Sequence, residues 1–409
     1  MNYSEYLDGS FDENTGEFNI HSAQENIFKS KAKLNILLMG TTGAGKSSLV
    51  NAMFGDQVVK AGAGKPITQY LEKIEIASKG ITLWDTKGIE AQDYENTKSQ
   101  LINDIKAGFD EAFKSGLDEH RPHIAWLCIK ETSSRIEQRE LDLLNITKEY
   151  GIPTIVVFTQ TQFEAGEEFF NVAKDELNNN FKSFLKNRFV RVNSIRYTFM
   201  NSEVLPSGLD HLLDETVKCL ADVSQTTLNE QAKRKEKIEA LYKGQEIDSE
   251  KKLQAMIQSA ENKVHIAAAA AATVGASPIP CSDAPLIAAI QSTMIYTLNS
   301  EFEVDSSLGD TTSIIAKILG VTALAQLGKT IVTNCLKFIP GGGTFIGGTI
   351  SAATAFAITE AVGHAYIKVL ENYYDPKTCQ VNLPETTALL KTFEVLFQQI
   401  YKNNSDAKV

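Results

Sequence analysis

Residues 40–47 read Gly-Thr-Thr-Gly-Ala-Gly-Lys-Ser and match the pattern GxxxxGK(S/T) in full. The segment follows an apolar run typical of a strand and opens a run typical of a helix. Its three glycines let backbone N–H groups turn toward phosphate oxygens, and the helix N-terminus adds partial positive charge. We expect Lys46 to neutralise the β- and γ-phosphates of a nucleotide and Ser47 to bind Mg²⁺. The predicted phosphate-binding residues are Gly40, Thr41, Thr42, Gly43, Ala44, Gly45, Lys46, Ser47 and Ser48.

Two later segments fit the same chemistry. Asp85-Thr86-Lys87-Gly88 ends a predicted strand and matches DxxG, so we expect Asp85 to hold Mg²⁺ through water and the Gly88 N–H to meet the γ-phosphate. Thr68 lies between the two motifs, where its hydroxyl and backbone can reach Mg²⁺ and the γ-phosphate. The predicted metal ligands are Ser47, Thr68 and Asp85, and the predicted catalytic residues are Lys46, Thr68, Gly88 and Lys87.

These motifs need a scaffold that brings several strand ends together. Apolar, β-rich runs alternate with helix-length segments up to about residue 225, which predicts a mostly parallel sheet with helices on both faces. The predicted strands are Leu34–Met39, Tyr70–Ala77, Ile81–Asp85, Ile124–Ile129, Thr154–Thr159 and Phe189–Asn193, and the helices between them include Ser47–Phe54, Glu137–Tyr150 and Gly166–Asn179. The sequence thus predicts an α/β P-loop NTPase domain followed by an all-α domain of helical hairpins.

Changes in composition divide the chain into five predicted parts. Residues 1–32 are a polar arm, and residues 33–225 are the α/β domain. Residues 226–263 are rich in charge and predict a helical linker that is broken near Gly244. Residues 264–375 are poor in charge and predict buried helices. Residues 376–409 contain a last amphipathic helix and a polar tail.

The charge balance limits the classes of partner. The 409 residues include 40 Lys and Arg and 51 Asp and Glu, which gives a net charge of −11. An acidic chain excludes sequence-independent DNA binding and disfavours RNA as a partner. The five cysteines form no CxxC pair, so we expect no zinc or redox motif. The first residues have no basic leader and no apolar core, so we expect a cytoplasmic protein.

The strings GTTGAGKSSLVNAMFG, PIT and DTKG resemble the Era/TrmE-like branch of the Ras-type GTPases over about residues 34–222. This resemblance implies GTP and GDP as ligands, Mg²⁺ as cofactor and GTP hydrolysis as activity. The strings GASPIPCSDAPLIAAIQ and IPGGGTFIGGTISAA are similar to hairpins of the YcjF family, a helical domain of unknown function that is often membrane-associated.

The residues that would read guanine depart from the pattern of these GTPases. Thr159-Gln160-Thr161-Gln162 stands where the family has (N/T)KxD. A glutamine offers one neutral acceptor oxygen where the family's aspartate accepts two charge-assisted hydrogen bonds, a loss of about 1.5–3 kcal/mol in discrimination. We still expect GTP, with Thr159, Gln160, Gln162 and Ser194 as the residues near the base.

The catalytic position departs as well. Ile89 follows DxxG where many Ras-type enzymes have a glutamine that orients the attacking water. Gly43 stands where some Era-like enzymes have an asparagine that binds K⁺. Three alternatives remain: Lys87 as an internal cation, a cation from a dimer partner, or slow hydrolysis. We predict slow hydrolysis, on the order of 10⁻⁴ to 10⁻² s⁻¹.

The run Phe338–Thr359 has no charged residue, yet Pro340 and several glycines break its start. It leaves three interpretations: a soluble domain packed on itself, reversible membrane contact, or stable insertion. We therefore expect a cytoplasmic protein that is either soluble or peripheral to the inner (plasma) membrane and that can form a homodimer or higher oligomer.

The predicted function is a nucleotide switch in which GTP hydrolysis controls the helical domain. Two alternatives stay open: a self-assembling nucleotide-binding scaffold with little turnover, and a ribosome-assembly GTPase. The low content of Lys and Arg in the second half disfavours the ribosomal alternative, because such proteins usually add a basic module for RNA.

Overall fold

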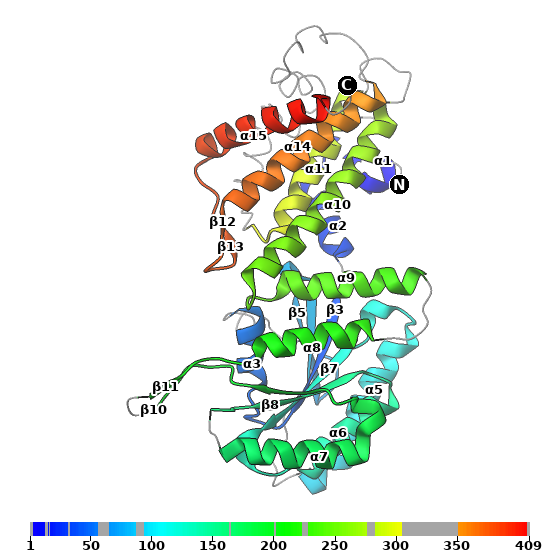
Figure 1. Cartoon of the computed structure of the whole chain (residues 1–409). Coiled ribbons are helices and arrows are strands. Elements are labelled where there is room, and N and C mark those ends of the chain that lie inside the picture. The colour runs from blue at the N-terminus through cyan, green and yellow to red at the C-terminus, as the bar shows by residue number, and fades with distance from the viewer. Residues whose placement is uncertain are drawn as a thin grey trace. The chain divides into compact units, whose positions relative to one another are not determined.

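The computed structural model of the protein describes residues 3–12, 15, 17–31, 33–55, 65–86, 94–162, 165–199, 202–222, 228–275, 283–304 and 351–406. The chain forms two compact units (Figure 1). The α/β unit contains residues 32–248, and the helical unit contains residues 1–31 and 249–409.

The α/β unit is built on one sheet whose strands lie, among the described residues, in the order β4-β5-β6-β3-β7-β8-β9. These strands are β4 (Lys65–Pro66), β5 (Leu71–Ile76), β6 (Ile81–Thr86), β3 (Leu34–Gly40), β7 (Ile124–Lys130), β8 (Thr154–Thr159) and β9 (Phe189–Val192). The strands from β6 to β9 in this order are parallel, and β5 pairs antiparallel with both β4 and β6. The mostly parallel sheet that the sequence predicted is confirmed.

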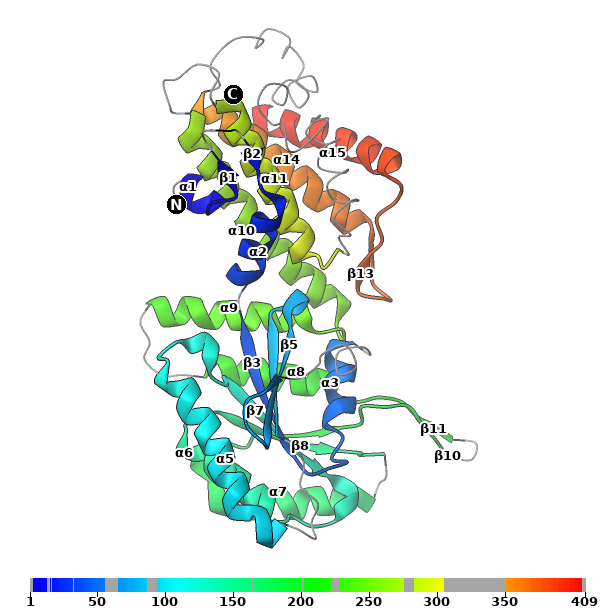
Figure 2. The same cartoon turned by 180° about the vertical axis from the view of Figure 1, so that it is seen from behind.

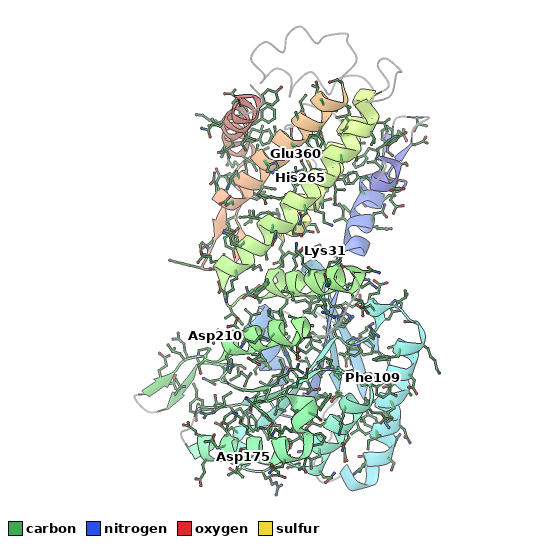
Figure 3. The ribbon with its side chains drawn as sticks, turned by 45° about the vertical axis from the view of Figure 1, so that its right-hand side comes forward. Lys31, Phe109, Asp175, Asp210, His265 and Glu360 are labelled. Carbon is green, nitrogen blue, oxygen red and sulfur yellow. The ribbon has the colours of Figure 1, made fainter. Side chains whose placement is uncertain are left out.

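Helices cover both faces of the sheet (Figures 1 and 2). They are α3 (Lys46–Phe54), α8 (Leu209–Ala221) and α9 (Leu228–Gly244) on one face, and α5 (Tyr94–Lys114), α6 (Gln138–Glu149) and α7 (Ala165–Leu185) on the other. Side chains of β3 alternate between the two cores, because successive residues of a strand point to opposite faces. Ile36 belongs to the core that contains Leu241 of α9, whereas Leu37 belongs to the core that contains Phe109 of α5, which Figure 3 labels.

Short elements join these helices and strands. Three are 3₁₀ turns: η1 (Ala77–Lys79), η3 (Asp118–His120) and η4 (Glu131–Ser133). β10 (Tyr197–Phe199) and β11 (Ser202–Val204) form an antiparallel hairpin that projects from the α/β unit after β9 (Figure 1).

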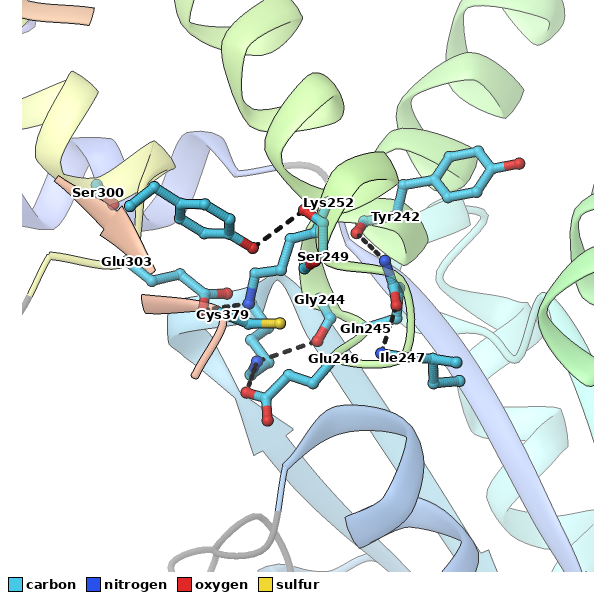
Figure 4. Close-up of polar contacts among 12 residues, drawn as sticks. Tyr242, Gly244, Gln245, Glu246, Ile247, Ser249, Lys252, Ser300, Glu303 and Cys379 are labelled. Atoms are coloured by element: carbon cyan, nitrogen blue, oxygen red, sulfur yellow. Dashed lines mark hydrogen bonds and ion pairs between the residues drawn. The ribbon is translucent and has the colours of Figure 1, made fainter. Parts of the chain in front are cut away.

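The turn after α9 is held by polar contacts within the α/β unit (Figure 4). Lys79 donates to the Gly244 carbonyl at 3.0 Å and pairs with Glu246 at 2.8 Å. The buried Gln245 side chain accepts from the backbone N–H groups of residues 247 and 248. The backbone N–H of Glu246 donates to the carbonyl of Met53 in the last turn of α3. This turn is therefore a fixed part of the α/β unit.

The helical unit is organised around long helices: α10 (Ser249–Gly275), α11 (Asp283–Glu301), α14 (Ala352–Asn372) and α15 (Thr386–Asp406). Shorter elements complete it: α1 (Tyr3–Leu7), β1 (Phe11–Asp12), β2 (Glu17–Phe18), α2 (Ile20–Ser30), β12 (Tyr374–Asp375) and β13 (Gln380–Val381). Small residues let α10 and α14 approach closely. A Cβ on Gly363 would lie 2.4 Å from the side chain of Val264. His265 and Glu360, labelled in Figure 3, face each other across these two helices.

The division into units differs from the expected one in two places. Residues 1–31 share the core of the helical unit through Leu7, Phe18 and Ile27, because apolar residues recur within this otherwise polar arm. The charged segment 226–263 is divided: its break near Gly244 is present, α9 belongs to the α/β unit, and α10 belongs to the helical unit.

Two sequence expectations fall wholly or partly outside the described residues. The strings GASPIPCSDAPLIAAIQ and IPGGGTFIGGTISAA fall partly among residues 276–282 and 305–350, which the structure does not describe. Of the uncharged run Phe338–Thr359, only residues from Ser351 onward are described, where α14 begins. Within the described ranges, none of the helices combines the length and apolar character needed to cross a membrane.

The assignment of α9 to the α/β unit is testable. Leu241 of α9 is fully buried, so Leu241→Ala should lower the free energy of unfolding by about 2–5 kcal/mol. Both tryptophans, Trp84 and Trp126, lie in the α/β unit, so tryptophan fluorescence during urea unfolding follows this unit. The exposed Glu236→Ala on the same helix is the control. An unchanged fluorescence transition in Leu241→Ala would contradict the assignment.

Candidate nucleotide-binding site

The predicted phosphate-binding loop leaves the sheet at the end of its central strand. All seven residues of β3 are buried, and the chain turns at Gly40, Gly43 and Gly45, whose φ angles are +140°, +73° and +79°. A Cβ at Gly40 would lie 2.4 Å from the carbonyl oxygen of Cys128 on β7. The loop therefore requires glycine, and it delivers Lys46 as the first residue of α3.

Lys46 and Asp85 meet at this edge of the sheet. The Lys46 ammonium donates to the Gly40 carbonyl at 3.0 Å and lies 3.8 Å from Asp85 Oδ1. Burial raises the pKa of Asp85 to about 6, because it outweighs the opposing effect of Lys46, and Glu72 adds to the rise. Ionising this buried carboxylate costs free energy, and a cation bound beside it would offset that cost.

The loops predicted to surround the base are tied to the phosphate-binding loop. Thr159 Oγ1 donates to the Ala44 carbonyl at 2.8 Å, and Gln160 Nε2 donates to the Gly43 carbonyl at 3.0 Å. Gln160 has a φ of +58°, and its Oε1 accepts from Thr132 at 3.2 Å. The structure thus joins two of the residues expected near the base, Thr159 and Gln160, to the phosphate-binding loop by hydrogen bonds.

Gln162 and Ser194 stand near this group at the same edge of the sheet. Gln162 Oε1 is buried and has no hydrogen-bond partner among the described residues. Ser194 follows β9, whose Val192 is paired with Thr159 at the end of β8. A buried acceptor oxygen without a donor is costly, so Gln162 is suited to accept from a ligand.

Thr68 lies in the turn between β4 and β5, close to α5. Its backbone N–H donates to Leu71, and the neighbouring Tyr70 N–H donates to Asp104 of α5 at 2.7 Å. Its Oγ1 is buried and, within the described part of the chain, has no partner. Leu71 is paired with Thr86 at the end of β6, so the turn lies at the edge that carries Asp85.

The donor set fits Mg²⁺, which prefers oxygen ligands. Asp85 Oδ1 and Thr68 Oγ1 are both buried oxygens that lack a hydrogen-bond partner in the described residues, and Ser47 is exposed at the start of α3. These three residues would hold the ion, which would neutralise phosphate charge when bound. Lys87, Gly88 and Ile89 lie outside the described residues.

One feature near the predicted base loops was missed from the sequence. Glu131, directly after β7, is buried and accepts two hydrogen bonds from Arg191 of β9, at 2.7 and 3.0 Å. Gly166 leaves room for it, since a Cβ there would collide with the carboxylate. The sequence could have indicated Glu131 only by its position at the end of a predicted strand. Nothing in the sequence indicated its distant partner Arg191.

Comparison with known proteins agrees with this geometry. Residues 35–160 match the family model described as 50S ribosome-binding GTPase. This stretch is a P-loop GTPase domain. A probable GTP-binding protein EngB from Koribacter versatilis is 25% identical over 158 residues, which cover 38% of this chain and 75% of that protein.

Two further similarities are weaker. Magnetosome membrane protein 22 from Magnetospirillum gryphiswaldense is 29% identical over 113 residues, which cover 28% of this chain and 58% of that protein. The structure of LeoA, a bacterial dynamin GTPase from ETEC, aligns with 99% of this chain and 93% of its own at 11% identity. Its TM-score of 0.35 is too low to establish a shared fold. The resemblances to the Era/TrmE-like branch and to the YcjF family stay predictions.

A pair of alanine substitutions tests the loop geometry of the GTPase domain. Both Gly40 and Gly43 have positive φ, so an alanine at either costs about 1–2 kcal/mol. Only Gly40→Ala adds a clash with the backbone, because nothing lies within 4 Å of a Cβ at Gly43. We expect Gly40→Ala to lower the free energy of unfolding by a further ~1–3 kcal/mol in urea titrations. Equal losses of unfolding free energy in Gly40→Ala and Gly43→Ala would contradict the close approach of Gly40 to the Cys128 carbonyl.

Asp85→Asn should reveal the cost of the buried carboxylate. The pKa of Asp85 is raised from 3.8 to about 6 in the folded protein, so folding is disfavoured when the group is ionised. Without nucleotide, Asp85→Asn should therefore be more stable than the wild type at pH 7. The difference should shrink as the pH falls through about 6 and vanish near 3.8. Thermal unfolding across this pH range measures it, and a variant that is less stable at pH 7 would speak against the assignment.

Proposed function

We propose that the protein is a GTP-binding switch with slow, Mg²⁺-dependent GTP hydrolysis. The observation that carries the proposal is the convergence of the Lys46 ammonium, the glycine backbone of residues 40–45 and Asp85 at one edge of the sheet. A cation, a glycine-rich loop at a helix N-terminus and a carboxylate at the end of a buried strand suit a nucleotide phosphate with its metal.

The base is guanine in this proposal, read through Gln162. Its buried Oε1 has no donor among the described residues, and guanine N1–H is a donor that such an oxygen can accept. Gln160 contributes by fixing the phosphate-binding loop, because its side-chain amide donates a hydrogen bond to the Gly43 carbonyl. The neutral glutamine accepts fewer hydrogen bonds than an aspartate, so guanine preference is weaker than in GTPases with the full motif.

A path for the switch runs through α3. This helix begins at Lys46, and near its other end the Met53 carbonyl accepts from the Glu246 N–H in the turn before residue 249. Gly55, at the end of α3, gives Glu246 room, because a Cβ there would lie 2.6 Å from its carboxylate. In this proposal, nucleotide-dependent movement of α3 reaches the helical unit through this turn and alters its contacts with a second copy of the chain or with the inner membrane from the cytoplasmic side.

Competition binding tests the nucleotide assignment. GDP, GTP, ATP and XTP compete with a fluorescent guanine nucleotide in the presence of Mg²⁺. We expect GDP and GTP to bind at least tenfold more tightly than ATP, and Gln162→Asp to widen this gap while Gln162→Ala narrows it. The exposed Gln138→Ala on α6 is the control. Equal competition by all four nucleotides would contradict guanine recognition.

A further inference from the structure

A cavity of about 420 Å³ opens at the edge of the sheet opposite the phosphate-binding loop. Residues just before β7 and β8, including His123 and Pro153, line it together with the end of α5, the end of α8 and the first half of α9. The phosphate-binding loop follows the carboxyl end of β3, which is parallel to β7. Seven residues of β7, about 23 Å at 3.3 Å per residue, therefore separate the two edges.

Positive charge predominates in this cavity. Its charged lining residues are the cations Arg121, Lys233, Arg234 and Lys237 and the carboxylates Asp118 and Glu230. Four cations against two carboxylates leave an excess of positive charge, in a chain whose net charge is −11. Burial, with a contribution from Lys237, lowers the pKa of His123 to about 4, so this histidine is neutral at pH 7.

Asp118 holds two of these cations in place. Its carboxylate accepts from Lys237 at 2.5 Å and from Arg121 at 2.8 Å. Burial opposes ionisation of Asp118, but contacts with Lys237, His123 and Arg121 lower its pKa to about 2. The carboxylate is therefore charged, and one negative charge orders two positive ones beside the cavity.

Part of the lining is aromatic. The rings of Phe113 and Tyr150 lie 5.5 Å apart between their centroids, and the Arg121 guanidinium lies 5.7 Å from the Phe113 ring. Both rings line the cavity. Its volume falls within the range of small-molecule sites, which is about 300–1,000 Å³.

We propose that this cavity binds a small phosphorylated molecule with a flat ring. A phosphate monoester carries about −1.5 to −2 charges at pH 7, which matches the excess of positive charge, and the aromatic wall can pack against a ring. The site lies between α5 and α9, away from the predicted nucleotide site, and it does not depend on the proposed function.

Phenyl phosphate is the probe that tests this proposal, with calorimetric titration of the full chain. We expect one saturable site, with phenol and inorganic phosphate each binding at least tenfold more weakly because each supplies half of the contacts. Lys46→Ala, which alters only the predicted nucleotide site, should leave the affinity for phenyl phosphate unchanged. Lack of saturable binding, or a loss of affinity in Lys46→Ala, would overturn the proposal.

Variants on α9 locate the binding. Lys233→Gln combined with Arg234→Gln should weaken phenyl phosphate at least tenfold, and Lys233→Gln alone, at an exposed position, about threefold. Lys235→Gln is the matched control, because Lys235 is exposed on the same helix but does not line the cavity. Tryptophan fluorescence checks that the α/β unit of each variant is folded. An equal loss in Lys235→Gln would show nonspecific attraction to the helix and reject the site.

Discussion

The close approach of two parallel strands at Gly40 is the constraint on which the nucleotide site depends. β3 is buried throughout, and its last residue lies so near the Cys128 carbonyl that a side chain has no room. The chain can leave the strand only through backbone angles that favour glycine, and it then starts α3. As a result Lys46 lies at the end of this strand. Its ammonium donates a hydrogen bond to the Gly40 carbonyl and lies 3.8 Å from Asp85 Oδ1.

This loop is also the point to which the other parts of the site are attached. Thr159 and Gln160 hold its carbonyl oxygens from the end of β8, and α3 extends from it to the turn that contains Glu246. In the proposed function, phosphate binding, base recognition and coupling to residues beyond 248 would therefore all depend on one short segment of backbone. The buried oxygens of Asp85, Thr68 and Gln162, which lack partners in the described part of the chain, are consistent with a site built for a ligand and a cation.

Much of the α/β fold was predictable because local patterns encode it. The strand Thr154–Thr159 has the predicted bounds, and the helix after the phosphate-binding loop begins within one residue of the predicted start. Long-range packing was not predictable from local patterns. Nothing local linked Glu131 to Arg191 or placed residues 1–31 in the helical core. α5 was not among the predicted helices, although its buried Leu101, Ile105 and Phe109 recur at helical spacing. The phosphate-binding residues were visible because their chemistry lies in one segment, whereas the contacts of Gln160 join segments far apart in the chain.

The affinity of the protein for GDP with Mg²⁺, compared between the wild type and Lys46→Ala, tests the central claim most directly. Gln138→Ala, at an exposed position of α6, serves as the control, and tryptophan fluorescence verifies the fold of each variant. Loss of a charge-assisted contact of about 1.5–3 kcal/mol predicts at least roughly tenfold weaker binding in Lys46→Ala. Equal affinity in the wild type and Lys46→Ala would contradict a phosphate site built around this lysine.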